Sequence, residues 1–450
     1  MITSTAFAGK HYAVLGLARS GLATVAALLE SGARVTAWDS DPDAVESIRS
    51  SRAKSRDVAQ RVSTSLDTNG LKFLDLDEAD LTIFDSIVVT PGLPLNRHPI
   101  AARARAAGVE VIGDIELFAR ARPELPPHKV VGITGTNGKS TTTALIHHIL
   151  QTAGVPSLMG GNIGLPILSA DPLPDGGVYV LELSSYQLDL TQSLDCDVAV
   201  LLNITPDHLD RYDSFEAYAA SKRRLFLMQT EGHFGVFNID DWRASLTEFQ
   251  HWDGSEGYRG TSVVSTGRII GDVQLSYALQ GPHNAENAGA AVEVARLLID
   301  GERVIEKALG TYSGLPHRME RVAEKDGMSF VNDSKATNAT ATAPALAAFP
   351  AIRWILGGQA KTDNLDECAP HFSHVRSAYT IGEAAGMFER LLAPHMVVKN
   401  CGELGEAVKQ AAADAEEGDT VLLSPACASF DQYRDFEARG DHFRALVGAL

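Results

Sequence analysis

Hydrophobic positions recur along this chain as short runs, each followed by a polar turn and then by a longer stretch with helical periodicity. The first unit has an apolar run at 12–15, a glycine-containing turn at 16–21 and a helical stretch at 22–30. A second run at 34–38 follows at once and ends on Asp39. Strand-length runs that alternate with helix-length stretches predict a parallel sheet covered by helices.

The same alternation continues through the rest of the chain. A stretch with three prolines, 120–127, is predicted to be a linker, and Gly314-Leu315-Pro316 marks a second boundary. We therefore predict three α/β domains: a Rossmann-like domain at 1–126, a central P-loop ATPase-like domain with a mostly parallel sheet at 127–314, and a Rossmann-like domain at 315–450. The further predicted strands are 86–90, 129–133, 178–183, 197–202, 329–332, 353–356 and 420–423, and the further helices are 140–153, 215–228 and 285–298.

Length and charge narrow the class of protein. A chain of 450 residues is too long for a single hydrophobic core. A formal net charge of −18 opposes general nucleic-acid binding. The four cysteines have no metal-binding spacing and are typical of reduced thiols in a cytosolic protein. Without a signal-peptide pattern or a membrane-length apolar run, we expect a cytoplasmic, soluble, monomeric protein with no nucleic-acid or membrane partner.

The most informative motif lies between a predicted strand and a predicted helix, and reads Gly135-Thr136-Asn137-Gly138-Lys139-Ser140-Thr141. Glycines let backbone N–H groups turn towards phosphate oxygens, and the following helix N-terminus favours an anion. Lys139 would contact the β- and γ-phosphates of ATP, and the Ser140 hydroxyl would bind Mg²⁺. The strict P-loop pattern requires glycine at position 133, where this chain has Ile133. The alternative interpretation is a tight turn with an incidental lysine.

The N-terminal turn is a weaker signal. Its Gly16-x-Ala18-x-x-Gly21 pattern has alanine where a dinucleotide-binding turn has its second glycine. Asp39 occupies the place of a ribose-binding carboxylate. The turn predicts diphosphate binding, with UDP as plausible as NAD, whereas the alternative is that its glycines serve packing alone.

Three further residues follow strands or lie in a helix of the central segment. Glu182 ends a buried-looking strand beside the phosphate loop, where a carboxylate suits Mg²⁺, although a surface acid that caps a helix is the alternative. His208 follows another predicted strand, and a lone histidine is more often structural. Lys222 lies in a predicted helix, where a solvated charge is the usual interpretation.

Several strings of this chain, taken together and in this order, resemble the Mur ligases over essentially the whole length. They are GTNGKST, GGNIG (160–164), LELSSYQL, ITPDHLDRY, GLPHRME and NDSKATN. The strings GDIELF (113–118) and LLSPACASFDQYRDFEARG (422–440) resemble the branch of the family that adds D-glutamate. The acceptor motif usual in the diaminopimelate- and lysine-adding members is missing, and Asn137 replaces the histidine expected of the L-alanine-adding member.

The resemblance implies an ATP-dependent ligase that joins D-glutamate to UDP-N-acetylmuramoyl-L-alanine in peptidoglycan precursor synthesis. The carboxylate would take the γ-phosphoryl group of ATP to form an acyl phosphate, which the amine of D-glutamate would then attack. The implied cofactors are ATP and two Mg²⁺ ions. The three domains would close on one another, with the nucleotide on the central domain and the amino acid on the last.

Family roles carry over to individual positions. Lys139, Lys222, His208 and Lys335 would act in catalysis, with Lys222 carried as a carbamate that joins Ser140, Glu182 and His208 as metal ligands. ATP would be held by the phosphate loop, residues 135–141, and by Asn284, Asn287, Arg318 and Asp333. The UDP substrate would contact Arg19, Ser20, Asp39, Ser40, Thr90, Asn162 and Gln187, and D-glutamate would contact Lys335, Thr337, Lys361, Ser429, Phe430 and Phe436.

Two positions depart from the family pattern in the predicted uracil pocket. Arg19 replaces a small apolar residue, and Asp41 stands where a basic residue often follows the second strand. Other classes of function compatible with the sequence are an NAD-dependent oxidoreductase, an ATP-driven regulatory module and a sister ligase with another acceptor. The oxidoreductase would leave the phosphate loop and its acidic neighbour without a purpose.

Overall fold

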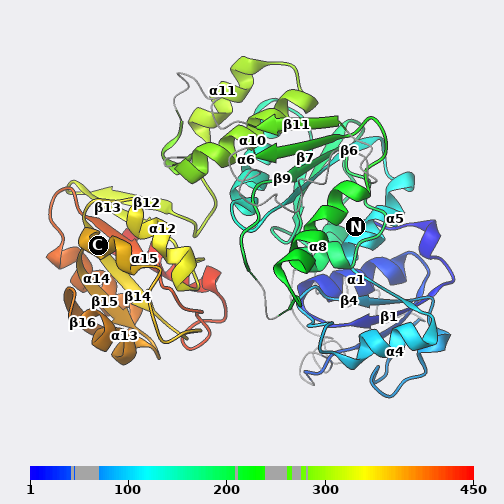
Figure 1. Ribbon diagram of the computed structural model, residues 1–450, viewed down its shortest axis with the longest axis horizontal. Helices are drawn as coiled ribbons and strands as arrows, with labels where there is room; N and C mark the ends of the chain where they lie inside the picture. The colour runs from blue at the N-terminus through cyan, green and yellow to red at the C-terminus, as the bar shows by residue number, and fades with distance from the viewer. Residues whose placement is uncertain (42–44, 46–69, 208–210, 239–260, 266–274, 280–281) are drawn as a thin grey trace. The chain divides into compact units, whose positions relative to one another are not determined.

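A computed structural model describes residues 1–41, 45, 70–207, 211–238, 261–265, 275–279 and 282–450, and Figure 1 labels its elements. The chain forms two compact units. The first comprises Met1–Gln274 and Pro282–Gly310, and the second comprises Leu275–Gly281 and Thr311–Leu450. The first unit contains two sheets and the second contains one, so the prediction of three α/β domains is confirmed.

The N-terminal domain contains a parallel sheet in the order β3-β2-β1-β4-β5. From β1 the chain adds β2 and β3 on one side of the sheet and then β4 and β5 on the other, so the strand order reverses beside β1. Open α/β sheets bind their ligands at such a point. The turns that follow β1 and β4 meet at this point. The strands are β1 His11–Leu15, β2 Arg34–Trp38, β3 Leu71–Phe73, β4 Ser86–Val89 and β5 Glu110–Ile112, and the helices are α1 Arg19–Glu30, α4 Pro99–Ala107 and α5 Asp114–Ala121.

The central domain contains a six-stranded parallel sheet in the order β11-β10-β9-β6-β8-β7. Strand β6 lies between β9 and β8, so the phosphate loop after it again lies where the strand order reverses. The strands are β6 His128–Thr134, β7 Ser157–Gly161, β8 Gly177–Glu182, β9 Val198–Leu201, β10 Phe234–Asn238 and β11 Thr261–Ser265. The helices are α6 Lys139–Thr152, α7 Ser185–Asp189, α8 Phe215–Leu227, α10 Pro282–Leu298 and α11 Glu302–Thr311.

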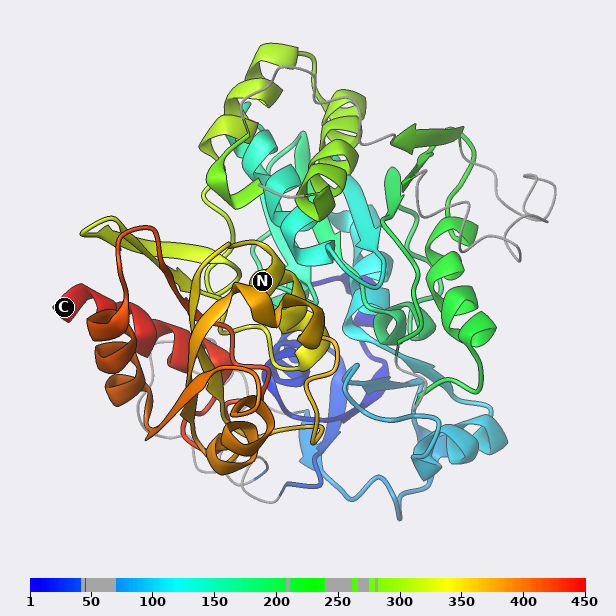
Figure 2. The same ribbon diagram turned by 60° about the vertical axis from the view of Figure 1, so that its left-hand side comes forward.

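The C-terminal domain contains a sheet in the order β12-β13-β17-β14-β15-β16, in which only the pair of β12 and β13 is antiparallel. Helices α12 and α13 cover one face of the sheet and α14 and α15 cover the other (Figures 1 and 2). Apolar residues of each pair pack against the face that the pair covers. The strands are β12 Glu320–Lys325, β13 Met328–Asn332, β14 Ile352–Gly357, β15 Val375–Ile381, β16 Val397–Gly402 and β17 Thr420–Leu423. The helices are α12 Ala339–Ala347, α13 Ala385–Leu392, α14 Leu404–Asp414 and α15 Phe436–Ala449.

The predicted linker at 120–127 is wrong in its first part. Arg120 and Ala121 form the end of α5, and Arg122–Glu124 is a short 3-10 helix. Arg120 donates to Glu110 and Glu116, and Arg122 donates to the Asp195 carbonyl. The prolines suggested a free connection, but ion pairs and backbone contacts hold this segment in place.

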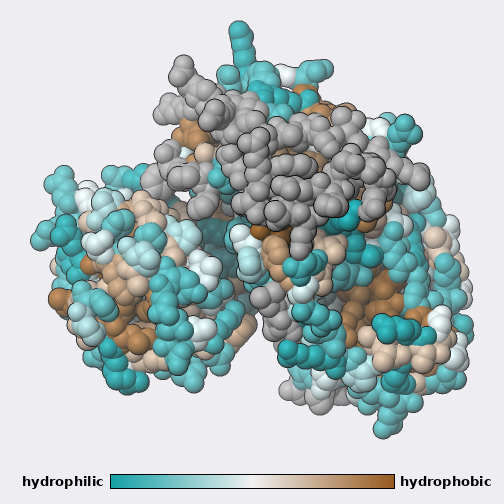
Figure 3. Space-filling model, viewed as in Figure 1, coloured by the Kyte–Doolittle hydropathy of each residue, from teal (hydrophilic) through white to brown (hydrophobic). Residues whose placement is uncertain are grey.

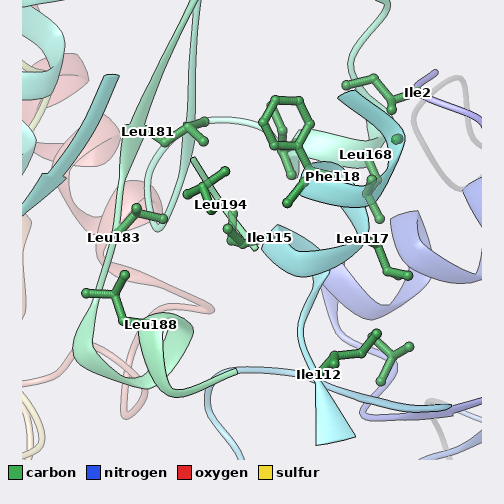
Figure 4. Close-up of a cluster of buried hydrophobic side chains, with 14 of the residues drawn as sticks. Ile2, Ile112, Ile115, Leu117, Phe118, Leu168, Leu181, Leu183, Leu188 and Leu194 are labelled. Atoms are coloured by element: carbon green, nitrogen blue, oxygen red, sulfur yellow. The ribbon is translucent and has the colours of Figure 1, made fainter. Parts of the chain in front are cut away.

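The N-terminal and central domains share one hydrophobic core. Figure 4 shows Ile115, Leu117 and Phe118 of α5 directed into a cluster that also contains Leu181 and Leu183 of the central domain. Because this core is continuous, the two domains form one unit. The labelled side chains are Ile2, Ile112, Ile115, Leu117, Phe118, Leu168, Leu181, Leu183, Leu188 and Leu194.

The helices of the described residues can be compared with the length and apolarity that a bilayer requires. None of the helices within the described ranges is long and apolar enough to cross a bilayer. On the face drawn in Figure 3, hydrophilic and hydrophobic residues are interspersed over the C-terminal domain.

Candidate active site

The phosphate loop connects β6 to α6, as predicted. Gly135 and Gly138 have φ angles of 152° and 82°, in the region that glycine adopts readily and other residues rarely do. Gly138 forms the N-cap of α6 without a side-chain cap, so the N-terminus of α6 is available to an anion. The loop is anchored from the side by Asn203, whose Oδ1 accepts from Asn137 N at 2.8 Å and whose carbonyl accepts from Thr136 N at 2.9 Å.

Two lysines converge on one carbonyl of this loop. Lys139 Nζ lies 2.9 Å from the Gly135 oxygen, and Lys222 Nζ, from α8, lies 2.8 Å from the same atom. Lys222 is 2% exposed, and its ammonium lies 4.7 Å from the ring centroid of Tyr218. Burial lowers the pKa of Lys222 well below its usual value, and the charge of Lys139 lowers it further. The interpretation of Lys222 as a solvated surface charge is therefore wrong.

Glu182 lies at the end of β8 and is 2% exposed. Its Oε1 accepts from Asn162 Nδ2 at 2.8 Å, while its Oε2 is buried and has no hydrogen-bond partner among the described residues. A buried carboxylate oxygen without a hydrogen-bond partner costs free energy. A bound cation would supply the missing partner, so this oxygen fits a metal ligand. The interpretation of Glu182 as a surface acid is wrong.

Not all of the predicted metal ligands can be placed. Ser140 is buried at the start of α6, and His208 lies outside the described residues. Among the residues that are described, no three His, Cys, Asp or Glu side chains form a cluster able to hold a metal ion. The metal site thus remains a prediction, supported by the unpaired oxygen of Glu182.

Helix α7 carries the predicted substrate residue Gln187. The Gln187 Oε1 accepts from the Ser184 backbone at 3.1 Å, and Ser184 Oγ accepts from Gln187 N, which together form a capping box. The described residues give the Gln187 Nε2 no hydrogen-bond partner. This amide nitrogen is the group that Gln187 can offer to a substrate.

Helix α10 brings the predicted adenine-side residues to the phosphate loop. A Cβ atom at Gly138 would lie 2.1 Å from Asn287 Oδ1, so the absence of a side chain there permits this close approach. Asn287 is 7% exposed, and its Nδ2 lies 3.4 Å from Asn284 Oδ1. The structure therefore places Asn284 and Asn287 together beside the loop.

At the N-terminal turn, the glycines pack against the protein itself. A Cβ at Gly16 would lie 2.3 Å from Thr90 Oγ1, and one at Gly21 would lie 1.8 Å from the Gly16 oxygen. The Asp39 carboxylate accepts from Leu17 N at 2.6 Å and from Asp41 N at 2.9 Å. The packing explanation for these glycines is thus supported. Diphosphate binding by this turn and its neighbours Arg19, Ser20, Ser40 and Thr90 stays a prediction.

In the second unit, the turn before β12 is held in an unusual backbone conformation. His317 and Met319, which flank Arg318, have φ angles of 61° and 46°. Asn332 Nδ2 lies 3.0 Å from His317 Nδ1, and Met319 N donates to Asp333 Oδ1 at 3.2 Å. These contacts bring the predicted ATP residues Arg318 and Asp333 to one end of β13.

The Asp333 carboxyl is buried and accepts from Ser424 Oγ at 2.8 Å. Burial raises its pKa to about 7, against the opposing effect of that hydrogen bond. Because this value exceeds the ~3.9 of an unfolded aspartate, Asp333 contributes stability that is present below about 4 and is lost as the pH rises through about 7. We expect the unfolding free energy of the wild type, relative to Asp333→Asn, to fall across this window.

Urea unfolding of both proteins between pH 4 and pH 8 measures this difference. The exposed Asp363→Asn, in the same domain, is the control and should show no such trend. A difference between wild type and Asp333→Asn that does not vary with pH would contradict the interpretation.

The predicted D-glutamate residues lie on three loops of the C-terminal domain and, in the case of Phe436, at the start of α15. Lys335 Nζ lies 3.9 Å from the ring centroid of Phe436, and Ser429 is 2% exposed. Phe430 is 68% exposed and Lys361 is also exposed. The loops that carry these residues follow β13, β14 and β17, whose carboxyl ends lie at the same edge of the sheet.

Arg439 joins these loops and was missed in the sequence. It is 1% exposed, and its guanidinium donates to Ser334 Oγ and to the carbonyls of Ser334 and Cys427 at 2.9–3.1 Å. Longer contacts of 3.4 Å reach Gly357 and Ala428. Burial lowers the pKa of Arg439 to about 10. The string FEARG carried no signal for this role, because α15 contains several charged residues and the Ser334 acceptors of Arg439 lie far away in sequence.

Comparison with known proteins agrees with this geometry. Three family models match in series: a Mur ligase MurD-like N-terminal domain at 10–113, a Mur ligase middle domain at 133–295, and a Mur ligase glutamate ligase domain at 317–427. The chain belongs to the Mur ligase family, whose members are ATP-dependent ligases acting on small molecules.

Relatives match over the whole chain, among them the two that follow. The UDP-N-acetylmuramoylalanine–D-glutamate ligase of Novosphingobium aromaticivorans is 58% identical over 450 residues, covering 100% of this chain and 97% of that protein. The enzyme of the same name from Zymomonas mobilis is 54% identical and covers 100% of both chains.

Solved structures with low sequence identity share the fold. The MurF ligase of Thermotoga maritima, solved in complex with ADP, has a TM-score of 0.59 at 15% identity and covers 98% of this chain and 96% of its own. The UDP-N-acetylmuramate–alanine ligase of the same organism has a TM-score of 0.58 at 15% identity and covers 98% and 99%. These two structures bear on the fold alone.

Proposed function

We propose that this protein joins D-glutamate to UDP-N-acetylmuramoyl-L-alanine with hydrolysis of ATP, in the cytoplasmic synthesis of the peptidoglycan precursor. The observation that supports this most strongly is the full-length identity of 54–58% to relatives that carry this activity in their names. The phosphate loop and the buried Glu182 beside it supply the chemistry that the activity needs.

A carboxylate and an amine do not condense in water, so the L-alanyl carboxylate must first be activated. We propose that it attacks the γ-phosphorus of ATP, which breaks the bond to ADP and forms an acyl phosphate. The amine of D-glutamate, once it has lost a proton, attacks the acyl carbon, and phosphate leaves. Backbone N–H groups of the loop and the Lys139 ammonium would stabilise the charge that develops on the transferring phosphoryl group.

Magnesium ions would be held by Ser140, Glu182, the undescribed His208 and a modified Lys222. When bound, Mg²⁺ would neutralise charge on the phosphate oxygens and orient them. The buried, unpaired Oε2 of Glu182 supports this donor set.

Lys222 is proposed to carry a carbamate. An amine must be uncharged before it can attack CO₂, and burial together with the neighbouring Lys139 lowers the pKa of Lys222. In the carbamate, a new N–C bond forms and a proton leaves, so that an anion takes the place of the amine beside the Lys139 ammonium near the Gly135 carbonyl. Its oxygens would also be suitable Mg²⁺ ligands.

The loops joined by Arg439 are proposed to bind D-glutamate. Lys335 and Lys361 offer counter-charges for its two carboxylates, while Thr337 and Ser429 offer hydroxyls. Phe436 lies beneath the Lys335 ammonium and restricts its position. Phe430 and Phe436 would contact the carbon chain of the amino acid.

We expect D-glutamate to be the only good acceptor among common amino acids. A site built to pair a second carboxylate rejects acceptors that lack it by about four orders of magnitude. Phosphate release in the presence of ATP and UDP-N-acetylmuramoyl-L-alanine, measured over a panel of amino acids, tests this. Efficient use of L-alanine, L-lysine or diaminopimelate would instead indicate a sister ligase.

A further inference from the structure

Helix α5 connects the predicted UDP site to the central domain. At its start, Asp114 lines a small hollow together with Ser20 and Thr90, two residues predicted to contact the UDP substrate. Glu116 follows two residues later and is 1% exposed. The helix lies in the hydrophobic core shared by the two domains (Figure 4), where an ionised side chain needs compensating partners.

The Glu116 carboxylate reaches across this interface to the turn that follows α7. Its Oε2 accepts from Gln192 N at 2.7 Å and Ser193 N at 2.9 Å, and its Oε1 accepts from Ser193 Oγ at 2.8 Å. Arg120 Nε, on the next turn of α5, donates to Oε1 at 2.9 Å. Three of these four hydrogen bonds therefore connect the N-terminal domain to the central domain.

A second contact joins the same two segments. Gly113 N donates to the Leu190 carbonyl at 3.0 Å, and a Cβ at Gly113 would lie 3.2 Å from Leu190 Cβ. Leu190 N and Thr191 Oγ1 both donate to the Gln187 carbonyl, at 3.1 and 2.7 Å. The segment held by α5 is thus continuous, through direct hydrogen bonds, with Gln187, the residue predicted to offer its Nε2 to the substrate.

We propose that Glu116 is a positioning residue, which fixes α7, and with it Gln187, relative to the nucleotide-binding turn of the N-terminal domain. The inference rests on the proposed function, because the UDP-muramoyl substrate would have to contact both places at once. A substrate that bridges two fixed sites gains affinity from their spacing, and this gain is lost if one site can move.

Binding measurements with two ligands separate this role from a structural one. UDP alone would engage only the N-terminal turn, whereas UDP-N-acetylmuramoyl-L-alanine would also reach α7. For Glu116→Gln we expect the Kd of the complete substrate to rise about tenfold, with the Kd of UDP and of ADP unchanged within about twofold. The KM for the complete substrate should rise in parallel.

Glu110→Gln is the matched control. Glu110 also pairs with Arg120, through bonds of 2.6 and 2.8 Å, but its hydrogen-bond partners Arg120 and Ser86 both belong to the N-terminal domain. The Glu110→Gln substitution removes the same charge and disturbs the same arginine without affecting α7. The Kd of UDP and the Kd of the complete substrate should therefore stay near those of the wild type. If Glu116→Gln does not fold, Ser193→Ala removes one of the interdomain bonds and should raise the substrate Kd about threefold.

The outcomes are distinguishable. Equal weakening of UDP and complete substrate, or an unchanged Kd for both with only a lower Tm, would overturn the positioning role and leave the proposed function intact. Failure of the wild type to bind UDP-N-acetylmuramoyl-L-alanine at all would overturn the proposed function and the positioning role together.

Discussion

Replacement of Lys139 by alanine is expected to lower kcat about a hundredfold or more, with the fold retained. The lysine is half-buried, and its ammonium contacts the carbonyls of Gly135 and Thr136 in the loop rather than the hydrophobic core. A positive charge directed at a transferring phosphoryl group contributes on the order of 3 kcal/mol or more to transition-state stabilisation. Steady-state phosphate release measures the loss, and thermal unfolding checks the fold.

The control for this variant is Lys129→Ala. Lys129 lies on β6, the strand that leads into the loop, and its side chain is exposed. Its removal should leave kcat unchanged, because substitutions at exposed positions usually have effects within about 0.5 kcal/mol. A Lys139→Ala enzyme that keeps the wild-type kcat would disprove the assignment of the phosphate loop.

Lys222→Ala is the second variant with a large expected effect. If the lysine carries a carbamate, its removal deletes an anion from the predicted magnesium site, and we expect kcat to fall about a hundredfold or more. Acetate, a small carboxylate, should restore part of the activity by entering the space that the side chain leaves. The measurement is phosphate release as a function of acetate concentration, at constant ionic strength.

Two comparisons sharpen this test. Lys222→Arg fills the same space with a cation that does not form a carbamate, so it should be inactive and should not respond to acetate. Lys307→Ala, at an exposed position of α11, should behave as the wild type. Near-normal activity of Lys222→Ala would end the carbamate hypothesis. If both Lys222 variants lose activity and acetate restores neither, Lys222 is needed for activity but does not act as a carboxylate.

The three-domain α/β architecture and about half of the described strands could be predicted because the apolar pattern is strong. The predicted strands at 34–38 and 420–423 have the observed bounds, and the other predicted strands overlap the observed ones to within a residue or two. The prediction of a linker at 120–127 was wrong in its first part because prolines signal a break in a helix but carry no information about ion pairs. The bond from Arg120 to Glu116 is local to α5, whereas the bond to Glu110 on β5 depends on how the helix packs beside that strand.

The site could be predicted where a residue's role is local. The phosphate loop follows from glycines and a lysine between a strand and a helix, and the structure has that arrangement. All residues of β8 are buried, so the strand pattern already suggested that Glu182 is covered. The burial of Lys222 could not be derived from the periodicity of α8, because its contact with Gly135 arises from tertiary packing. Arg439 and Glu116 were missed for the same reason, because their partners lie far away in sequence.

The most direct test of the central claim is an omission experiment on the purified protein. ATP, UDP-N-acetylmuramoyl-L-alanine and D-glutamate are supplied together or with one left out, and both phosphate and the UDP-linked product are quantified. The proposed function predicts one phosphate for each UDP-N-acetylmuramoyl-L-alanyl-D-glutamate formed, and no product when any one of the three is missing. Phosphate release at the full rate without D-glutamate or without the UDP substrate, with no UDP-linked product, would contradict it.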